Sequence, residues 1–407
     1  MMTNPNQQQG NGADQPHAPL YPVTQVLAGY APGFRLVKGL VDSSVDQFTV
    51  VPAQGMPRLL LPTQHAAMAT ALKSFVGRHR LVSAAPSVLK LVSKLAGGKP
   101  VLTRDVSLIG DDNRTSPLRD LFASVVGRTD FELAFRLSVG RPNAKTVAMA
   151  ITAEGEALCF AKFGSEAMTN SLVAFEGKVL EHFNGRDLSV LMPRVLYSGM
   201  WAGDHNVLIT EPVNISVLKR QATIAHQAAD DFTMASPVTH TTLRASTYWR
   251  SVLDRIGSIR DQPENVAMLS RAAEAIDGTW GNTEFHFGYS HGDWSRANLG
   301  IVDGKLVALD WERCTPDAPR GIDIAHFAII ETSSSRSNRL LDLERIEAQT
   351  RRYLGEIGRS PSYARPLIVF DLVEMMLRFS NARAVGLPSK DSNFGAALHA
   401  ALLQWTL

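Results

Sequence analysis

The stretch Ser290-His-Gly-Asp-Trp-Ser-Arg-Ala-Asn298, with the two short apolar runs that follow it, determines the fold prediction for this chain. These runs, 297–302 and 305–309, are separated by Asp303-Gly304. Asp-Gly between two apolar runs is a strong signal for a two-residue β-hairpin turn. The sequence therefore predicts a hairpin that begins at the end of the quoted stretch and runs up to Asp310.

The open end of this hairpin carries polar side chains that can converge, because a hairpin returns on itself. Asp293 and Asn298 lie before and at the start of its first strand, and Asp310 lies at the end of its second. An Asp that orients a hydroxyl, with an Asn and a second Asp as oxygen ligands for magnesium, is the set that phosphoryl transfer from ATP requires. The pattern predicts Asp293 as the catalytic base and Asn298 and Asp310 as metal ligands.

The bulk composition is that of an ordinary globular protein. The chain has 407 residues, of which 45% are hydrophobic and 20% charged, with a net charge of +2. That charge is too small to favour a nucleic-acid or membrane partner, and no run approaches the ~20 apolar residues of a membrane span. Cys159 and Cys314 lack metal or disulfide spacing and are predicted to be core residues. A cytoplasmic protein is expected, and the sequence predicts no oligomeric state.

Three regions are predicted upstream of the quoted stretch. Residues 1–20 are polar and are expected to form a disordered tail. Residues 21–115 predict short strands with helices over 64–76 and 87–95, and their role is open. From Ser116 the chain predicts a helix to about 126, then strands at 131–137, 145–152 and 157–162, a helix at 169–183, and strands near 194–197 and 206–210. Beyond Pro212 the pattern is mostly helical, with the hairpin as the exception.

The quoted stretch, followed by Val307-Ala-Leu-Asp310-Trp-Glu312, resembles the aminoglycoside phosphotransferase and choline kinase superfamily of small-molecule kinases. The catalytic loop of that superfamily reads His-Gly-Asp-x4-Asn, and its Gly, where protein kinases usually have Arg, argues against a protein kinase. Pro319-x-Gly321-x-Asp323, followed by His326-Phe327, further resembles a bacterial branch found in actinomycetes.

The resemblance implies an α+β, protein-kinase-like fold of two lobes. A small antiparallel lobe is expected over 116–213. A mainly helical lobe is expected over 214–407, with the catalytic hairpin at 290–312. Residues 21–115 would be an extra N-terminal α/β region.

The resemblance also implies ATP and Mg2+ as cofactors, with the nucleotide site in the small lobe. Lys162 would contact the α and β phosphates and pair with Glu176. Gly140 and Lys145 lie where the phosphate-covering loop is expected, and the hinge that binds adenine through its backbone would contain Glu211 and Val213. His291 is interpreted as a scaffold for the catalytic loop and Asp323 as its brace. His182, His205, His286 and His326 show no metal spacing, and no role is predicted for them.

The acceptor is left open by the sequence. A polycationic aminoglycoside demands an acid-lined pocket, for which the candidates are Asp317, Glu331, Asp371 and Glu374. Arginines interspersed over 331–390 fit a neutral or anionic hydroxyl compound, such as a sugar, at least as well. An aminoglycoside phosphotransferase, a nucleotide-binding regulator or pseudokinase, and an enzyme that transfers AMP remain alternatives, and ATP is not distinguished from GTP.

Overall fold

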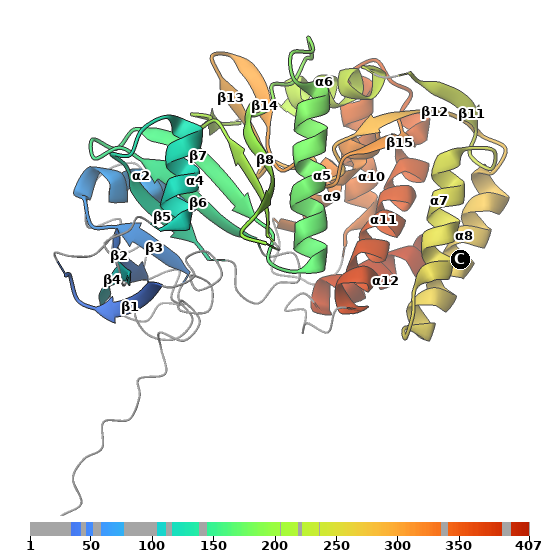
Figure 1. The fold of residues 1–407 in the computed structure, drawn as a ribbon. Helices are drawn as coiled ribbons and strands as arrows, with labels where there is room; N and C mark the ends of the chain where they lie inside the picture. Colours follow the sequence, from blue (N-terminus) through green and yellow to red (C-terminus); the bar gives the residue numbers. More distant parts are fainter. Residues whose placement is uncertain are drawn as a thin grey trace, which may run out of the picture.

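The computed structural model describes residues 34–41, 46–51, 58–76, 104–110, 116–137, 145–203, 205–218, 222–235, 237–334, 341–384 and 392–406. A strand-rich part and a mainly helical part lie side by side, with helix α5 (Ala167–Phe183) standing where they meet (Figure 1). The predicted α+β class is confirmed. The tail predicted for 1–20 and the helix predicted for 87–95 lie outside the described residues.

One antiparallel sheet of nine strands forms the strand-rich part. In spatial order its strands are β1 (Phe34–Lys38), β4 (Arg104–Gly110), β2 (Asp46–Val51), β3 (Leu59–Pro62), β5 (Glu132–Arg136), β6 (Thr146–Ile151), β7 (Ala157–Phe163), β9 (His205–Thr210) and β8 (Val195–Trp201). The predicted meander β5–β6–β7 is confirmed. Strand β3 pairs with β5. The regions 21–115 and 116–213, which the sequence predicts as separate units, therefore contribute strands to one sheet.

Two of the helices that pack on this sheet do so through separate apolar cores. Helix α2 (His65–Val76) shares a core with Leu59 and Leu61, whereas α4 (Pro117–Val126) shares one with Leu60. Alternate residues of a strand point to opposite faces, so the two helices cover opposite sides of the sheet. Helix α4 begins at the predicted cap, where the Ser116 hydroxyl accepts a hydrogen bond from the Arg119 N–H.

The mainly helical part is built around long buried helices. Its helices are α6 (Ala222–Met234), α7 (Thr247–Ser258), α8 (Pro263–Trp280), α9 (Ile322–Ser334), α10 (Leu343–Glu356), the short 3-10 helix η1 (Pro361–Tyr363), α11 (Ala364–Ala384) and α12 (Ser392–Thr406). The run Leu367–Phe370 in α11 is fully buried. Cys159 and Cys314 are buried, as predicted. None of the described helices is long and apolar enough to cross a membrane.

The predicted hairpin is present as β13 (Leu299–Val302) and β14 (Lys305–Ala308), joined by Asp303 and Gly304. Both turn residues have positive φ, 49° and 80°, as the tight turn between twisted strands requires. Strand β10 (Ser216–Val217) pairs with β13 and completes a sheet of three strands.

A second sheet of three strands was not predicted. It consists of β11 (Thr239–Thr242), β12 (Glu284–Ser290) and β15 (Thr315–Pro319), so the expectation that only the hairpin interrupts the helices after Pro212 is wrong. Strand β11 carries no large apolar side chain, and β15 contains two prolines, which are confined to sheet edges. Both are edge strands of β12 and lack the apolar alternation by which strands are identified.

Candidate active site

The loop that carries Asp293 is held between the end of β12 and the start of β13. Asn298 donates hydrogen bonds from Nδ2 to the Asp293 carbonyl oxygen at 2.9 Å and to Asp293 Oδ2 at 3.0 Å. The Leu309 N–H donates to the Asn298 carbonyl oxygen at 2.8 Å, so the hairpin brings the segment before Asp310 beside Asn298. The amide group of Asn298 is thus oriented by Asp293, and Oδ1 is its remaining oxygen for a metal.

His291 lies beneath this loop and is fully buried. Its Nδ1 accepts a hydrogen bond from the Asp293 N–H at 3.1 Å, and its Nε2 donates to the Leu309 carbonyl oxygen at 3.1 Å. This pattern requires the neutral ring with the proton on Nε2. Burial lowers the pKa of His291 and favours that same state. Both ring nitrogens are therefore engaged by backbone groups.

Asp323, in the first turn of α9, binds the other side of the loop. Its buried carboxylate accepts hydrogen bonds from the His291 N–H at 2.8 Å, the Gly292 N–H at 2.9 Å and the Ser290 hydroxyl at 3.2 Å. Three bonds to one carboxylate fix the backbone of the loop relative to α9. These are the contacts that a brace would make.

Lys162 of β7 joins the sheet to the hairpin. Its Nζ lies 2.7 Å from both carboxylate oxygens of Glu176 in α5 and 2.7 Å from Asp310 Oδ1. Burial lowers the pKa of Lys162, but the charges of Asp310 and Glu176 outweigh burial and raise the pKa above its usual value. Burial likewise opposes ionisation of Asp310, yet Lys162 and Lys145 keep its pKa below the usual value. The three side chains therefore form a charged cluster.

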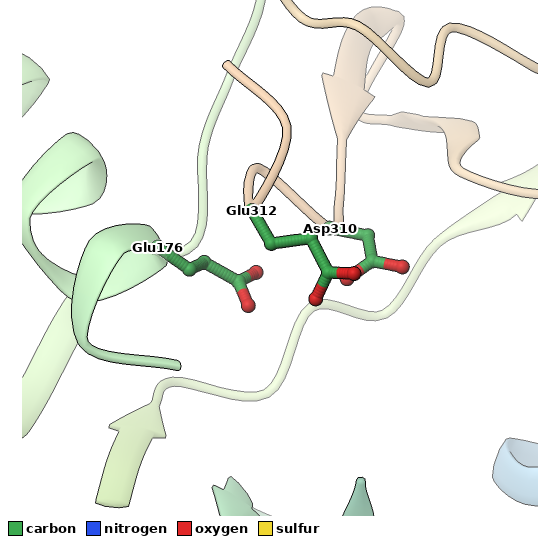
Figure 2. Close-up of side chains that lie close together, drawn as sticks. All are labelled: Glu176, Asp310 and Glu312. Carbon is green, nitrogen blue, oxygen red and sulfur yellow. The ribbon is translucent and has the colours of Figure 1, made fainter. Parts of the chain in front are cut away.

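Glu312 adds a third carboxylate to this cluster, and the sequence predicted no role for it. Figure 2 shows Glu176, Asp310 and Glu312 directed toward one another, and one carboxylate oxygen of each lies within 4.8 Å of the others. Lys145 forms a buried ion pair with Glu312. Burial lowers the pKa of Lys145 to about 8, and the positive charge of Lys162 acts in the same direction. The position of Glu312 two residues after Asp310 is the signal that could have identified it.

The backbone of Asp310 adopts a conformation that most residues avoid. Its φ is 69°, in the left-handed region that Asp tolerates better than larger residues do. Backbone strain of this kind gathers at functional sites. The strained backbone turns the chain directly after β14, where the carboxylate of Asp310 meets Lys162.

Gly140, Glu211 and Val213 are the other residues predicted to bind the nucleotide. Gly140 lies outside the described residues. Glu211 and Val213 lie in the segment that follows β9 and leads to β10. The Glu211 N–H donates to the Arg194 carbonyl oxygen at 2.9 Å, and its carboxylate forms a surface ion pair with Arg194. Their role as a hinge for adenine stays a prediction.

A contact with Asp293 that the sequence did not suggest comes from His326 of α9. Its Nε2 lies 3.2 Å from Asp293 Oδ1, and its Nδ1 lies 2.9 Å from Asp371 Oδ2. The three residues are separated by 33 and 45 positions in the chain, so no local spacing signals their meeting.

Gly292→Ala is expected to disable the site. Gly292 has a φ of 78°, and a Cβ there would lie 2.4 Å from the Arg313 carbonyl oxygen. The added methyl group would push the loop that carries Asp293 away from the segment after Asp310, and in an active site a displacement of about 1 Å can lower turnover about 100-fold. Gly304→Ala is the matched control, because Gly304 has a φ of 80° but nothing within 4 Å of its Cβ position. Equal turnover of the two variants in a steady-state assay would contradict the steric argument.

Comparison with known proteins gives structural similarity at low identity. No family model matches the chain, and no curated protein matches it. The apo form of a thermostable mutant of aminoglycoside phosphotransferase APH(4)-Ia is 13% identical, with 71% of this chain and 98% of that chain covered and a TM-score of 0.48. Amicoumacin kinase hAmiN in complex with AMP-PNP, Ca2+ and Ami is 13% identical, with coverages of 64% and 85% and a TM-score of 0.42. Similarity at this level assigns no activity, so the function rests on the site itself.

Proposed function

We propose that this protein is a small-molecule kinase that transfers the γ-phosphoryl group of ATP to a hydroxyl of its acceptor. The observation that carries the proposal is the convergence of Asp293 and Asn298 from the catalytic loop, Asp310 from the end of the hairpin, and Lys162 and Glu176 from the sheet and α5. Lys162 and Asp310 meet across 148 residues of sequence. These five groups are the ones that phosphoryl transfer requires, and the pairing of Lys162 with Glu176 that such a site needs is formed.

The oxygen donors of the site fit Mg2+. Asn298 offers Oδ1, and Asp310 offers its carboxylate beside those of Glu176 and Glu312. Magnesium binds hard oxygen ligands of this kind and keeps several waters. Bound there, Mg2+ would neutralise charge on the phosphate oxygens.

The residues of the chain would supply positioning and charge. Asp293, whose side chain is 41% exposed, would orient the acceptor hydroxyl and take its proton. Lys162 would steady the α and β phosphates, with Glu176 holding its ammonium group in place. His291 and Asp323 would keep the loop in position. Preorganised charge of this kind is a main source of acceleration in phosphoryl transfer.

The acids that a polycationic acceptor would need are already paired within the protein. Glu374 receives two hydrogen bonds from Arg255, at 2.8 and 2.5 Å, and Glu331 receives one from Arg296 at 2.7 Å. Asp371 binds His326, and Asp317 accepts a hydrogen bond from the Thr247 hydroxyl. Using any of the first three for an aminoglycoside would require breaking an existing charge pair, which favours another class of acceptor.

Two arginines, Arg313 and Arg378, lie close to Asp293 and to the loop that carries it. Arg378 donates from Nη1 to the Gly292 carbonyl oxygen at 2.6 Å. Burial lowers the pKa of Arg313, as does the charge of Arg378, while Asp293 and Asp310 act in the opposite direction. Positive charge beside Asp293 supports a neutral or anionic acceptor, such as a sugar or a sugar-containing metabolite, over an aminoglycoside.

An ATP-consumption screen tests this function. The panel contains neutral sugars, sugar acids, nucleosides, amino alcohols and aminoglycosides, with mass analysis of each product. We expect the product to come from a neutral or anionic acceptor and to be heavier than that acceptor by about 80 Da, the mass of a phosphoryl group. A gain of about 329 Da would instead indicate AMP transfer. The highest kcat/KM with an aminoglycoside would overturn the acceptor class, and ATP binding without any product would favour a regulator.

A further inference from the structure

His326 stands between two carboxylates. Its Nδ1 lies 2.9 and 3.2 Å from the two oxygens of Asp371, and its Nε2 lies 3.2 Å from Asp293 Oδ1. Asp371 belongs to α11 and is 2% exposed, and His326 of α9 is 3% exposed. A buried carboxylate is costly unless a charged partner compensates it, and His326 is the charged partner that these contacts provide.

The protonation state of His326 follows from its partners. An ionised carboxylate only accepts hydrogen bonds, so each ring nitrogen that faces one must carry a proton. With carboxylates on both sides, both nitrogens are donors and the ring is an imidazolium. His291 differs, because its Nδ1 faces an N–H group and must accept.

We propose that Asp371 and His326 form a cationic clamp that positions the carboxylate of Asp293 for catalysis. The clamp holds Oδ1 through the imidazolium, while Asn298 holds Oδ2 through its amide group. Rotation of the carboxylate is thereby blocked from both sides. Each oxygen retains acceptor capacity, so Asp293 can still bind the acceptor hydroxyl.

The clamp also sets how Asp293 acts as a base. Burial opposes ionisation of Asp293, but the hydrogen bond and charge of His326 outweigh burial and lower its pKa. A weakly basic Asp293 orients the hydroxyl and receives its proton as the O–P bond forms and the bond to ADP breaks. The proton moves from the hydroxyl to Asp293, and His326, which already carries two protons, takes none. The catalytic consequence therefore rests on the proposed phosphoryl transfer, whereas the charged state of His326 does not.

Other charged or titratable groups also surround the clamp and are the same in every variant used to test it. On the side of Asp293 they are His291, Asp310 and Arg313. On the side of Asp371 they are Tyr248 and Arg255 on α7 and Glu374 and Arg378 on α11. Burial lowers the pKa of His326, but Asp371 and Asp293 outweigh burial and raise it to about 10. A His whose pKa rises above about 6.5 on folding stabilises the fold fully below pH 6.5, and that contribution is lost as pH rises through 10.

The kinetic test uses two variants. His326→Gln keeps a neutral hydrogen-bond donor but removes the positive charge. It leaves the buried carboxylate of Asp371 without its cation and can therefore fold poorly. His326→Gln/Asp371→Asn removes both buried charges and avoids this problem. In the double variant we expect kcat to fall about 100-fold through misplacement of Asp293, with the Kd of ATP unchanged.

His226→Gln is the matched control. His226 is also fully buried, on α6, and it packs on Tyr353 and Phe327 at 3.9 and 4.9 Å between ring centroids, while neither of its ring nitrogens forms a hydrogen bond with a described residue. This substitution should change stability but leave kcat and the Kd of ATP as in the wild type. Wild-type kcat in the double variant would overturn the clamp.

Nitrogen NMR of histidine-labelled full-length protein tests the clamp without an acceptor. The signals of His326 are identified by their loss in His326→Gln, and at pH 8 both ring nitrogens should be protonated. A neutral ring at pH 8 would overturn the proposal. If the wild type transfers no phosphoryl group but His326 is an imidazolium, the proposed function fails while the charged pair stands.

Discussion

Asp293→Asn is expected to abolish phosphoryl transfer while leaving ATP binding intact. The amide retains the size of the carboxylate, but it keeps only one of the two oxygens that accept hydrogen bonds from His326 and Asn298, and it cannot take the proton of the acceptor hydroxyl. Loss of a positioned general base lowers turnover by about 100- to 10,000-fold. Since Lys162, Asn298 and Asp310 are untouched, the Kd of ATP measured by calorimetry should stay near the wild-type value.

Asp303→Asn is the control for this substitution. Asp303 lies in the exposed turn of the same hairpin, where its φ is 49°, and Asn is equally suited to that position. The control should retain wild-type turnover. Turnover of Asp293→Asn above one tenth of the wild type would remove Asp293 from the role of base.

Local signals account for what the sequence predicted well. Asp303-Gly304 specifies the turn, and the turn fixes the register in which Leu299 pairs with Ala308. That register places Asn298 beside the residue before Asp310, so the convergence of the two was predictable from a short stretch. The cap at Ser116 is equally local, because it depends on the N–H group three residues away.

Contacts between distant elements account for what was missed. His326 meets Asp293 and Asp371 only because α9 and α11 pack against the catalytic loop, and an isolated His carries no spacing signal. The joining of the N-terminal strands to the sheet depends on the pairing of Leu60 with Phe135, which no local pattern specifies. The sequence indicates acids that could bind a polycation but not the partners that these acids already have inside the protein. Glu374, for example, pairs with Arg255, which lies 119 positions away in the chain.

Lys162→Met should lower both activity and stability, and the two losses can be separated. Lys162 is the one ammonium group that contacts both Glu176 and Asp310 among the ion pairs of the described chain. Removing one member of a buried charge pair costs about 3–5 kcal/mol, and the lower end is expected because Lys162 is 26% exposed. Removing a preorganised charge from phosphate oxygens lowers kcat about 100- to 1,000-fold. Urea unfolding and steady-state kinetics measure the two effects.

Lys162→Met/Glu176→Gln separates them, because it removes the carboxylate that is 3% exposed and would otherwise be left without its cation. This double variant should recover much of the free energy of unfolding but none of the activity. Lys178→Met, on the exposed side of the helix that carries Glu176, controls for the loss of a lysine and should resemble the wild type in both measurements. If activity returned together with stability in the double variant, Lys162 would support the fold of the cluster and not the phosphates. If both losses persist, the site depends on Glu176 for more than the orientation of Lys162. The Trp311 N–H donates a hydrogen bond to Glu176 at 3.2 Å, and Trp311 follows Asp310 in the chain. Loss of Glu176 would then disturb Asp310 through this hydrogen bond.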